Sequence, residues 1–254
     1  MKKLLALAAL AATAPLFAAV ESPNIVGYTT MAVPSAVYTM YGPSFASVGA
    51  DGSALIKDMN YGATETGDTL LLIDPVSAAY TELTYLNSAD AKEYGGNEAV
   101  AGWYIVNDDD TVVYKGNESV SLGCAFWLYA GNGATSVTDA GEVKSSFTRT
   151  LPAALYSAFA NPFPTTVTLK SFTYSATETG DTMLLIDPAT AAYTELTYLN
   201  SADAKEYGGN EAVAGWYIVN DDDTVVYKGN EEFAPGQGCW IYPGNGTVTI
   251  SGNL

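Results

Sequence analysis

An internal repeat limits what this chain can fold into more than any other feature of the sequence. Residues 63–118 recur at residues 176–231 with a constant offset of 113, and only three of the 56 positions differ. Weaker similarity continues on both sides, where residues 34–38 match 152–156. Two copies of one unit of about 115 residues must therefore adopt the same fold.

The residue types of the repeated block are typical of β-strands. Tyr, Thr, Val, Ile and Trp dominate its apolar runs, and Gly, Asn, Asp and Pro interrupt them at short intervals. Residues 102–106 and 111–114 flank a four-residue loop, which predicts a hairpin that recurs at 215–227. Residues 69–73 and 79–85 predict two more strands.

We therefore predict an all-β chain with two tandem antiparallel β-sandwich-like domains, residues 20–140 and 141–254. Only residues 88–94 have the length and composition of a short helix.

Some predicted strands are apolar on both faces. A sheet with one face in water should alternate apolar and polar residues, but Phe126, Trp127, Leu128 and Tyr129 follow one another without interruption. Such a strand lies in a sandwich whose outer face is covered, or packs against the sister unit or a second molecule.

The N-terminus reads as an export signal. Lys2 and Lys3 precede an apolar run at 4–14, which Pro15 ends before it could span a membrane. We predict a signal peptide at residues 1–19 and no membrane span. The expected location is extracellular or on the cell surface, with the periplasm as the alternative.

The net charge excludes several classes of partner. Without Lys2 and Lys3 the chain has 8 basic and 28 acidic residues, so its net charge is 8 − 28 = −20. Such a charge repels nucleic acids and anionic membranes. Arg149 is the only arginine, so no arginine cluster exists to bind phosphate or sulfate groups.

Catalytic motifs are missing from the sequence. The chain has no histidine, which removes the most common general base and transition-metal ligand. It also has no G-x-S-x-G segment, phosphate-binding loop or dinucleotide-binding motif. We therefore predict that the protein is not an enzyme, and we assign no catalytic residues.

Two acidic loops are candidate calcium sites, and calcium is the only cofactor predicted. Calcium takes six to eight oxygen ligands, and the predicted ligands are Asp108, Asp109, Asp110, Asp221, Asp222 and Asp223. The alternative is a solvated hairpin turn, because Asn and Asp favour turns.

Aromatic side chains are candidates for binding sugar rings, whose apolar faces suit aromatic faces. Tyrosines in polar stretches are better candidates than the four tryptophans, which we expect in the core. The candidate tyrosines are Tyr80, Tyr85, Tyr94, Tyr193, Tyr198 and Tyr207.

The two cysteines occupy different positions in the two units. At the repeat offset Cys124 matches Gln237 and Cys239 matches Phe126. Both side chains would point to the same face of their units. A disulfide bridge between the units and a pair of small buried thiols are the two interpretations.

The sequence resembles a group of uncharacterised exported bacterial proteins. The resemblance rests on the stretch at residues 22–30, which contains Asn24, Ile25, Val26, Gly27 and Tyr28, and on the strand that begins with Phe126 and Trp127. It implies secretion and a β fold, and it implies no activity.

These features predict a non-catalytic secreted or cell-surface protein that forms part of a matrix, an envelope layer or a filament, with itself as the partner. The alternative is a module that binds carbohydrates or surfaces through tyrosines of both repeats, with cell-surface glycans as partners.

Overall fold

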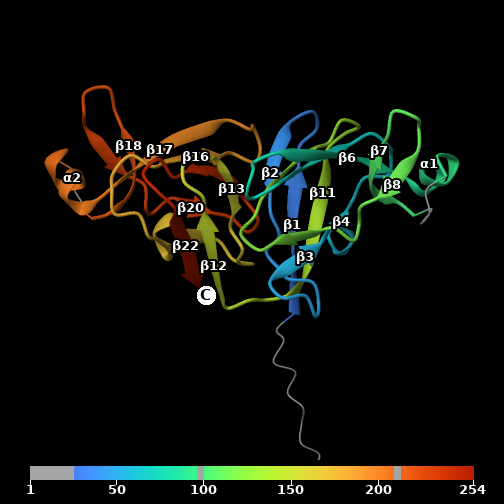
Figure 1. The fold of residues 1–254 in the computed structure, drawn as a ribbon, viewed down its shortest axis with the longest axis horizontal. Helices are drawn as coiled ribbons and strands as arrows, with labels where there is room; N and C mark the ends of the chain where they lie inside the picture. Colours follow the sequence, from blue (N-terminus) through green and yellow to red (C-terminus); the bar gives the residue numbers. More distant parts are fainter. Residues whose placement is uncertain (1–25, 96–99, 209–212) are drawn as a thin grey trace, which may run out of the picture.

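The computed structural model describes residues 26–95, 100–208 and 213–254. The fold is all-β, as predicted, with two short α-helices (Figure 1). The predicted signal peptide lies outside the described residues. No helix among the described residues has the length and apolar character needed to cross a membrane.

Each unit contains a six-stranded and a three-stranded antiparallel sheet. In the first unit the six-stranded sheet has the order β2-β10-β5-β6-β7-β8 and the three-stranded sheet the order β1-β11-β4. Its elements are β1 (Val26–Val33), β2 (Tyr38–Tyr41), β3 (Ser53–Leu55), β4 (Asn60–Tyr61), β5 (Thr69–Ile73), β6 (Tyr80–Leu86), α1 (Ser88–Glu93), β7 (Gly102–Val106), β8 (Val112–Tyr114), β9 (Ser119–Ser121), β10 (Phe126–Tyr129) and β11 (Thr135–Glu142).

The second unit repeats this topology. Its sheets have the orders β13-β21-β16-β17-β18-β19 and β12-β22-β15. Its elements are β12 (Ser146–Leu151), β13 (Ser157–Ala160), β14 (Val167–Thr168), β15 (Phe172–Tyr174), β16 (Thr182–Ile186), β17 (Tyr193–Leu199), α2 (Ser201–Glu206), β18 (Gly215–Val219), β19 (Val225–Tyr227), β20 (Glu232–Phe233), β21 (Gly238–Tyr242) and β22 (Val248–Asn253).

The sequence placed the elements of the repeated block well. The predicted hairpin forms from β7 and β8, and the predicted helix is α1, which Asn87 caps by accepting hydrogen bonds from the backbone N–H groups of Ala89 and Asp90. Strand β11 runs to Glu142 because β1 pairs with it along its whole length, with Gly141 opposite Gly27 and Glu142 opposite Val26.

The two sheets of each unit share one hydrophobic core. In the first unit Val137 from the three-stranded sheet packs in the same cluster as Leu70 and Phe126 from the six-stranded sheet. Tyr61, from β4, lies 4.9 Å from Trp103, measured between ring centroids. Burying such large rings stabilises each unit, because they remove much apolar surface from water.

A buried aspartate fixes the Gly-Asn-Gly turn of each unit. Asp68 is buried and accepts hydrogen bonds from the Tyr61 hydroxyl (2.7 Å) and the Asn132 backbone N–H (3.2 Å). In the second unit Asp181 accepts the equivalent bonds from Tyr174 and Asn245. These carboxylates are fully engaged in holding β-turns, so they are structural groups.

The two units join through two equivalent contacts, and the second contact is the first with the roles of the two units reversed. Tyr41 forms a bridge to Gln237, and Phe159, which occupies the position of Tyr41 in the second unit, forms a bridge to Cys124. Residue pairs exchanged in this way define a twofold relation between the units.

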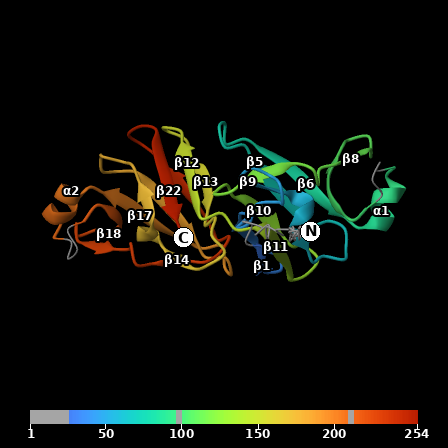
Figure 2. The same ribbon diagram turned by 90° about the horizontal axis from the view of Figure 1, so that it is seen from below.

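Backbone hydrogen bonds repeat this exchange. The Gly42 N–H donates to the Gly236 carbonyl (3.0 Å), and the equivalent Ala160 N–H donates to the Gly123 carbonyl (3.3 Å). The edge strands β2 and β13 therefore each reach into the other unit. The two six-stranded sheets extend outward from this junction, so β8 and β18 lie toward opposite ends of the long axis (Figure 1, Figure 2).

The junction needs small residues on one side of the axis. A Cβ on Gly238 would lie 2.2 Å from Cγ and 2.8 Å from Cβ of Met40. At the equivalent contact on the other side Ala125 faces Ala158, and the Ala125 N–H donates to the Ala158 carbonyl. Met40 therefore lies opposite a glycine, while the smaller Ala158 lies opposite an alanine.

We predict that Gly238→Ala destabilises the protein by about 1–3 kcal/mol, because the added methyl group overpacks the junction against Met40. The measurement is urea-induced unfolding followed by tryptophan fluorescence. Gly244→Ala is the matched control, since its Cβ would lie 3.5 Å from the nearest atom, Cε1 of Tyr242. Equal unfolding midpoints for both variants would contradict the junction geometry.

Candidate functional site

The six predicted tyrosines do not lie in one environment. Tyr80 and Tyr193 are 71% and 65% exposed, and Tyr94 and Tyr207 are partly exposed near the ends of the molecule. These four remain candidates for contact with a ligand.

The prediction for Tyr85 and Tyr198 is wrong, because both are core residues. They are 6% and 5% exposed. Tyr85 stands on the same face of β6 as buried Leu83, and its hydroxyl donates to the Ala63 carbonyl (2.9 Å). Strand alternation puts Tyr80 and Tyr85 on opposite faces of the sheet. The polar neighbours of Tyr85 in the sequence suggested an exposed side chain, but the strand face decides its burial.

Two equivalent aromatic triads lie on the outer face of the six-stranded sheets. Tyr38 packs at 4.8 Å from Tyr129 and at 6.3 Å from Trp127, measured between ring centroids. All three rings lie on the face opposite to buried Phe126 and Leu128, and all three are partly exposed.

The second unit carries the same triad. Tyr156 lies 4.9 Å from Tyr242 and 6.3 Å from Trp240. Trp127 and Trp240 both pack against the apolar cluster of the junction, so the triads flank the twofold axis. The sequence predicts these tryptophans in the core, but both are only half-buried. The uninterrupted apolar run at 126–129 was the signal for a second covered face.

The acidic loops are ordered as turns. The Asp109 carboxylate accepts hydrogen bonds from the hydroxyl (2.6 Å) and the backbone N–H (3.2 Å) of Thr111, which hold its pKa below the usual value. Asp222 and Thr224 repeat this arrangement. Throughout the described ranges, no three His, Cys, Asp or Glu side chains converge to hold a metal ion. Calcium binding by these loops stays a prediction. The described side chains do not form a site for the ion in advance.

The predicted disulfide is not formed, because a third strand separates the cysteines. Cys124 and Cys239 are both free thiols. Phe159 pairs with Cys239 on one side of β13 and with Cys124 on the other. The thiols are therefore two strand spacings apart, about 9–10 Å, and a bridge needs Cα atoms within about 7 Å. Cys239 is buried and Cys124 is half-buried, so the interpretation as buried thiols holds fully for Cys239 only.

The two outer edges of the joined sheets are the strands β8 and β19. Within the part of the chain that the structure describes, each pairs with one neighbouring strand only. Val113 and Val226 at these edges are 48% and 49% exposed. Both edges have the sequence Val-Val-Tyr, so the two ends of the molecule present the same strand.

The register shows which backbone groups face outward. The Asn107 N–H donates to the Thr111 carbonyl and the Lys115 N–H to the Trp103 carbonyl. Odd-numbered residues of β8 therefore form the hydrogen-bonded pairs with β7, and the peptide groups of Val112 point away from it.

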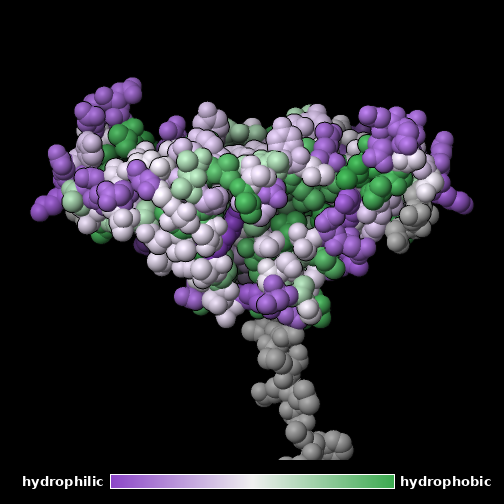
Figure 3. Space-filling view, viewed as in Figure 1, coloured by the Kyte–Doolittle hydropathy of each residue, from purple (hydrophilic) through white to green (hydrophobic). Residues whose placement is uncertain are grey.

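Hydrophilic residues gather at both ends of the long axis, while hydrophobic residues lie mainly between them (Figure 3). The repeated block 63–118 has 2 basic and 11 acidic residues, so each copy carries 2 − 11 = −9. Each end is therefore strongly acidic around its strand edge.

Asp139 is a buried carboxylate that only the first unit contains. Its Oδ2 accepts the backbone N–H groups of Ser44 (2.5 Å) and Phe45 (3.1 Å). Burial raises its pKa to about 6, although these hydrogen bonds act in the opposite direction. Position 252, its equivalent, is a glycine packed against Phe163.

Comparisons with family models, with curated proteins and with solved structures gave no match.

We predict that Asp139 makes the folded state less stable as the pH rises from about 4 to 6. The folded pKa lies above the usual value of 3.8, so the folded state binds more protons than the unfolded state in this window. The loss approaches about 3 kcal/mol, at about 1.4 kcal/mol per pKa unit. Asp139→Asn keeps one oxygen for both N–H donors and removes the titration.

The measurement is the free energy of unfolding in urea for both proteins at pH 4 and pH 7. Relative to the variant, the natural protein should lose stability at the higher pH. A difference between the two proteins that is the same at both pH values would show that Asp139 does not titrate in this window.

Proposed function

We propose that the protein is a non-catalytic, exported assembly subunit whose molecules join end to end through β8 and β19. The observation that supports this proposal is the presence of the same strand edge at both ends of a pair of sheets that backbone hydrogen bonds join at the centre. The export step is the one predicted from the N-terminal sequence.

Edge strands associate by adding a strand to a neighbouring sheet, with backbone hydrogen bonds supplying the affinity. Two identical edges can pair with each other antiparallel, as in a twofold contact. Because each molecule carries two such edges at opposite ends, every contact leaves a further edge available. The product is a linear filament, the basic element of a matrix or envelope layer.

Charge controls this association. Two ends that each carry −9 repel one another in low salt, and the repulsion falls when ions screen it. Divalent cations, calcium included, screen it more effectively than monovalent ones. Assembly is therefore expected to need salt or calcium, without a dedicated metal site in the Asp loops.

We predict that the chain without its signal peptide forms linear oligomers in moderate salt or calcium, and that Val113→Glu with Val226→Glu weakens the association at least about tenfold. The added carboxylates would face each other across the paired edges. Size-exclusion chromatography with light scattering and electron microscopy measure the change.

The control is Val106→Glu with Val219→Glu. These valines are 42% and 41% exposed and lie on the neighbouring strands β7 and β18, so they add the same charge near the same ends away from the edge. A strict monomer under every condition, or an equal effect of both double variants, would refute assembly through these edges.

A carbohydrate- or surface-binding module is the second candidate, and the twin aromatic triads favour it. Clustered Tyr and Trp rings that are partly exposed suit the apolar faces of sugars. Two triads on one molecule would bind a repetitive glycan surface bivalently, which strengthens attachment without new contacts.

We predict, for this second candidate, that Tyr38→Ala with Tyr156→Ala weakens binding on a glycan array at least about threefold. Tyr28→Ala is the control, because Tyr28 is an exposed tyrosine (76%) on β1, outside the triads and outside the candidate tyrosines. An array without any signal, or an equal loss in the control and the double variant, would remove the triads as a sugar site.

A further inference from the structure

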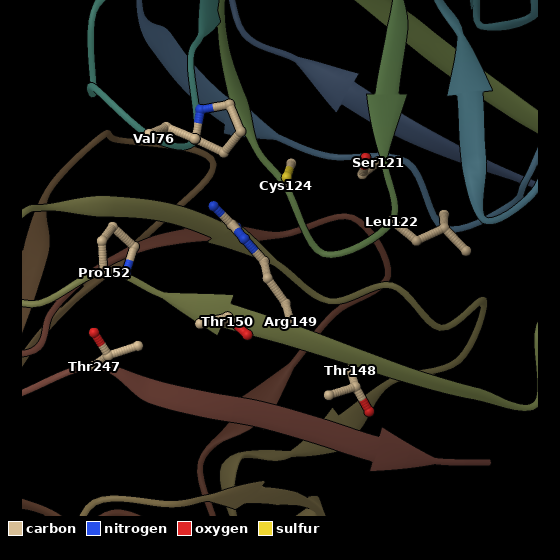
Figure 4. Close-up of a pocket in the computed structure, with 10 residues that line it drawn as sticks. Val76, Ser121, Leu122, Cys124, Thr148, Arg149, Thr150, Pro152 and Thr247 are labelled. Atoms are coloured by element: carbon tan, nitrogen blue, oxygen red, sulfur yellow. The ribbon is translucent and has the colours of Figure 1, made fainter.

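A cavity of about 540 Å³ lies between the two units and is lined by both of them. The first unit contributes Pro75, Val76, Leu122 and Cys124, and the second contributes Arg149 and Thr150. Figure 4 shows the Arg149 side chain reaching from strand β12 toward Cys124 of the other unit. The only arginine of the chain is therefore at the wall of a cavity between domains, a common location for ligands.

Arg149 has an unusual environment for a guanidinium group. Its Nη1 donates to the carbonyl oxygens of Gly123 (2.6 Å) and Ala158. Among the residues that the structure describes, Nη2 and Nε have no protein acceptor, and no carboxylate lies within 4.0 Å of the group. Burial lowers the pKa of Arg149.

A partly buried cation without a counter-ion loses hydration free energy, which an anion can offset. Nη2 and Nε can donate two parallel hydrogen bonds to a carboxylate. Multiply charged anions fit less well, because the cavity has one cation and the chain is strongly acidic. The remaining wall is largely apolar, with Pro75, Val76 and Leu122.

We infer that this cavity binds a small organic monocarboxylate, its carboxylate on Arg149 and its apolar body against Val76 and Leu122. The cavity has the size of a typical small-molecule site. Because both units line it, an occupied site would also strengthen the junction.

The competing interpretation is that Arg149 only clips the two units together through its carbonyl contacts. Both interpretations predict that Arg149→Gln weakens the junction. Only the ligand site predicts saturable binding of a carboxylate, and a variant that blocks the cavity while keeping Arg149 separates them.

The probes are benzoate and hexanoate, with benzamide as the neutral counterpart of benzoate. Calorimetry and NMR titration are done on the chain without its signal peptide at about 150 mM salt, where charge repulsion is screened within about 8 Å. We expect saturable binding of at least one carboxylate and at least about tenfold weaker binding of benzamide.

Three variants complete the test. Arg149→Gln should weaken carboxylate binding at least about tenfold, and Val76→Trp should do the same by filling the cavity from an exposed position whose counterpart in the other unit is Ala189. Lys144→Gln removes one positive charge elsewhere and should leave the affinity within about twofold. If Arg149→Gln does not fold, Val76→Trp decides. No saturable binding to the natural protein, or equal binding by Val76→Trp, would overturn the inference.

Discussion

Backbone pairing across the junction is the interaction on which the rest of the structure depends. Strands β2 and β13 each bond to the other unit, through Gly42 and Gly236 on one side and Ala160 and Gly123 on the other. Without these bonds only the linker between β11 and β12 would connect the two units. With them, the two six-stranded sheets extend in opposite directions (Figure 1), which puts identical strand edges at the two ends. The cavity that both units line lies between them.

The junction also gives a physical account of why the flanks of the repeat differ more than the block. The junction contains two equivalent contacts, Met40 with Gly238 and Ala158 with Ala125, and each must fit the same narrow space. A large residue in one unit therefore requires a small residue opposite it in the other, so the two flanks can differ in sequence. The block lies away from the axis, where each copy has the same surroundings and the same sequence can serve twice.

Much of the chemistry of this chain is used for structure. Asp68 and its copy hold turns, and Asp109 closes a hairpin loop. The features that structure alone does not fully use lie at the surface of the junction and at the ends of the molecule. They are the exposed tyrosines of the aromatic triads, the nitrogens Nη2 and Nε of Arg149 in the cavity, and the strand edges. The proposed assembly and ligand binding use these features, and neither proposal requires a general base in a chain that lacks histidine.

The sequence by itself determined the repeat, the all-β class, the hairpin, the helix at residue 88 and the acidic charge, because each depends on local residue patterns. It did not distinguish the buried tyrosines from the exposed ones, because Tyr85 and Tyr80 lie on the same strand and differ only in the face to which they point. Only the tertiary structure decided how the units join, because the pairing of a strand edge depends on residues that lie far apart in the sequence. That choice placed Phe159 between the two cysteines, brought Arg149 to a cavity and turned two copies of one strand into the opposite ends of the molecule.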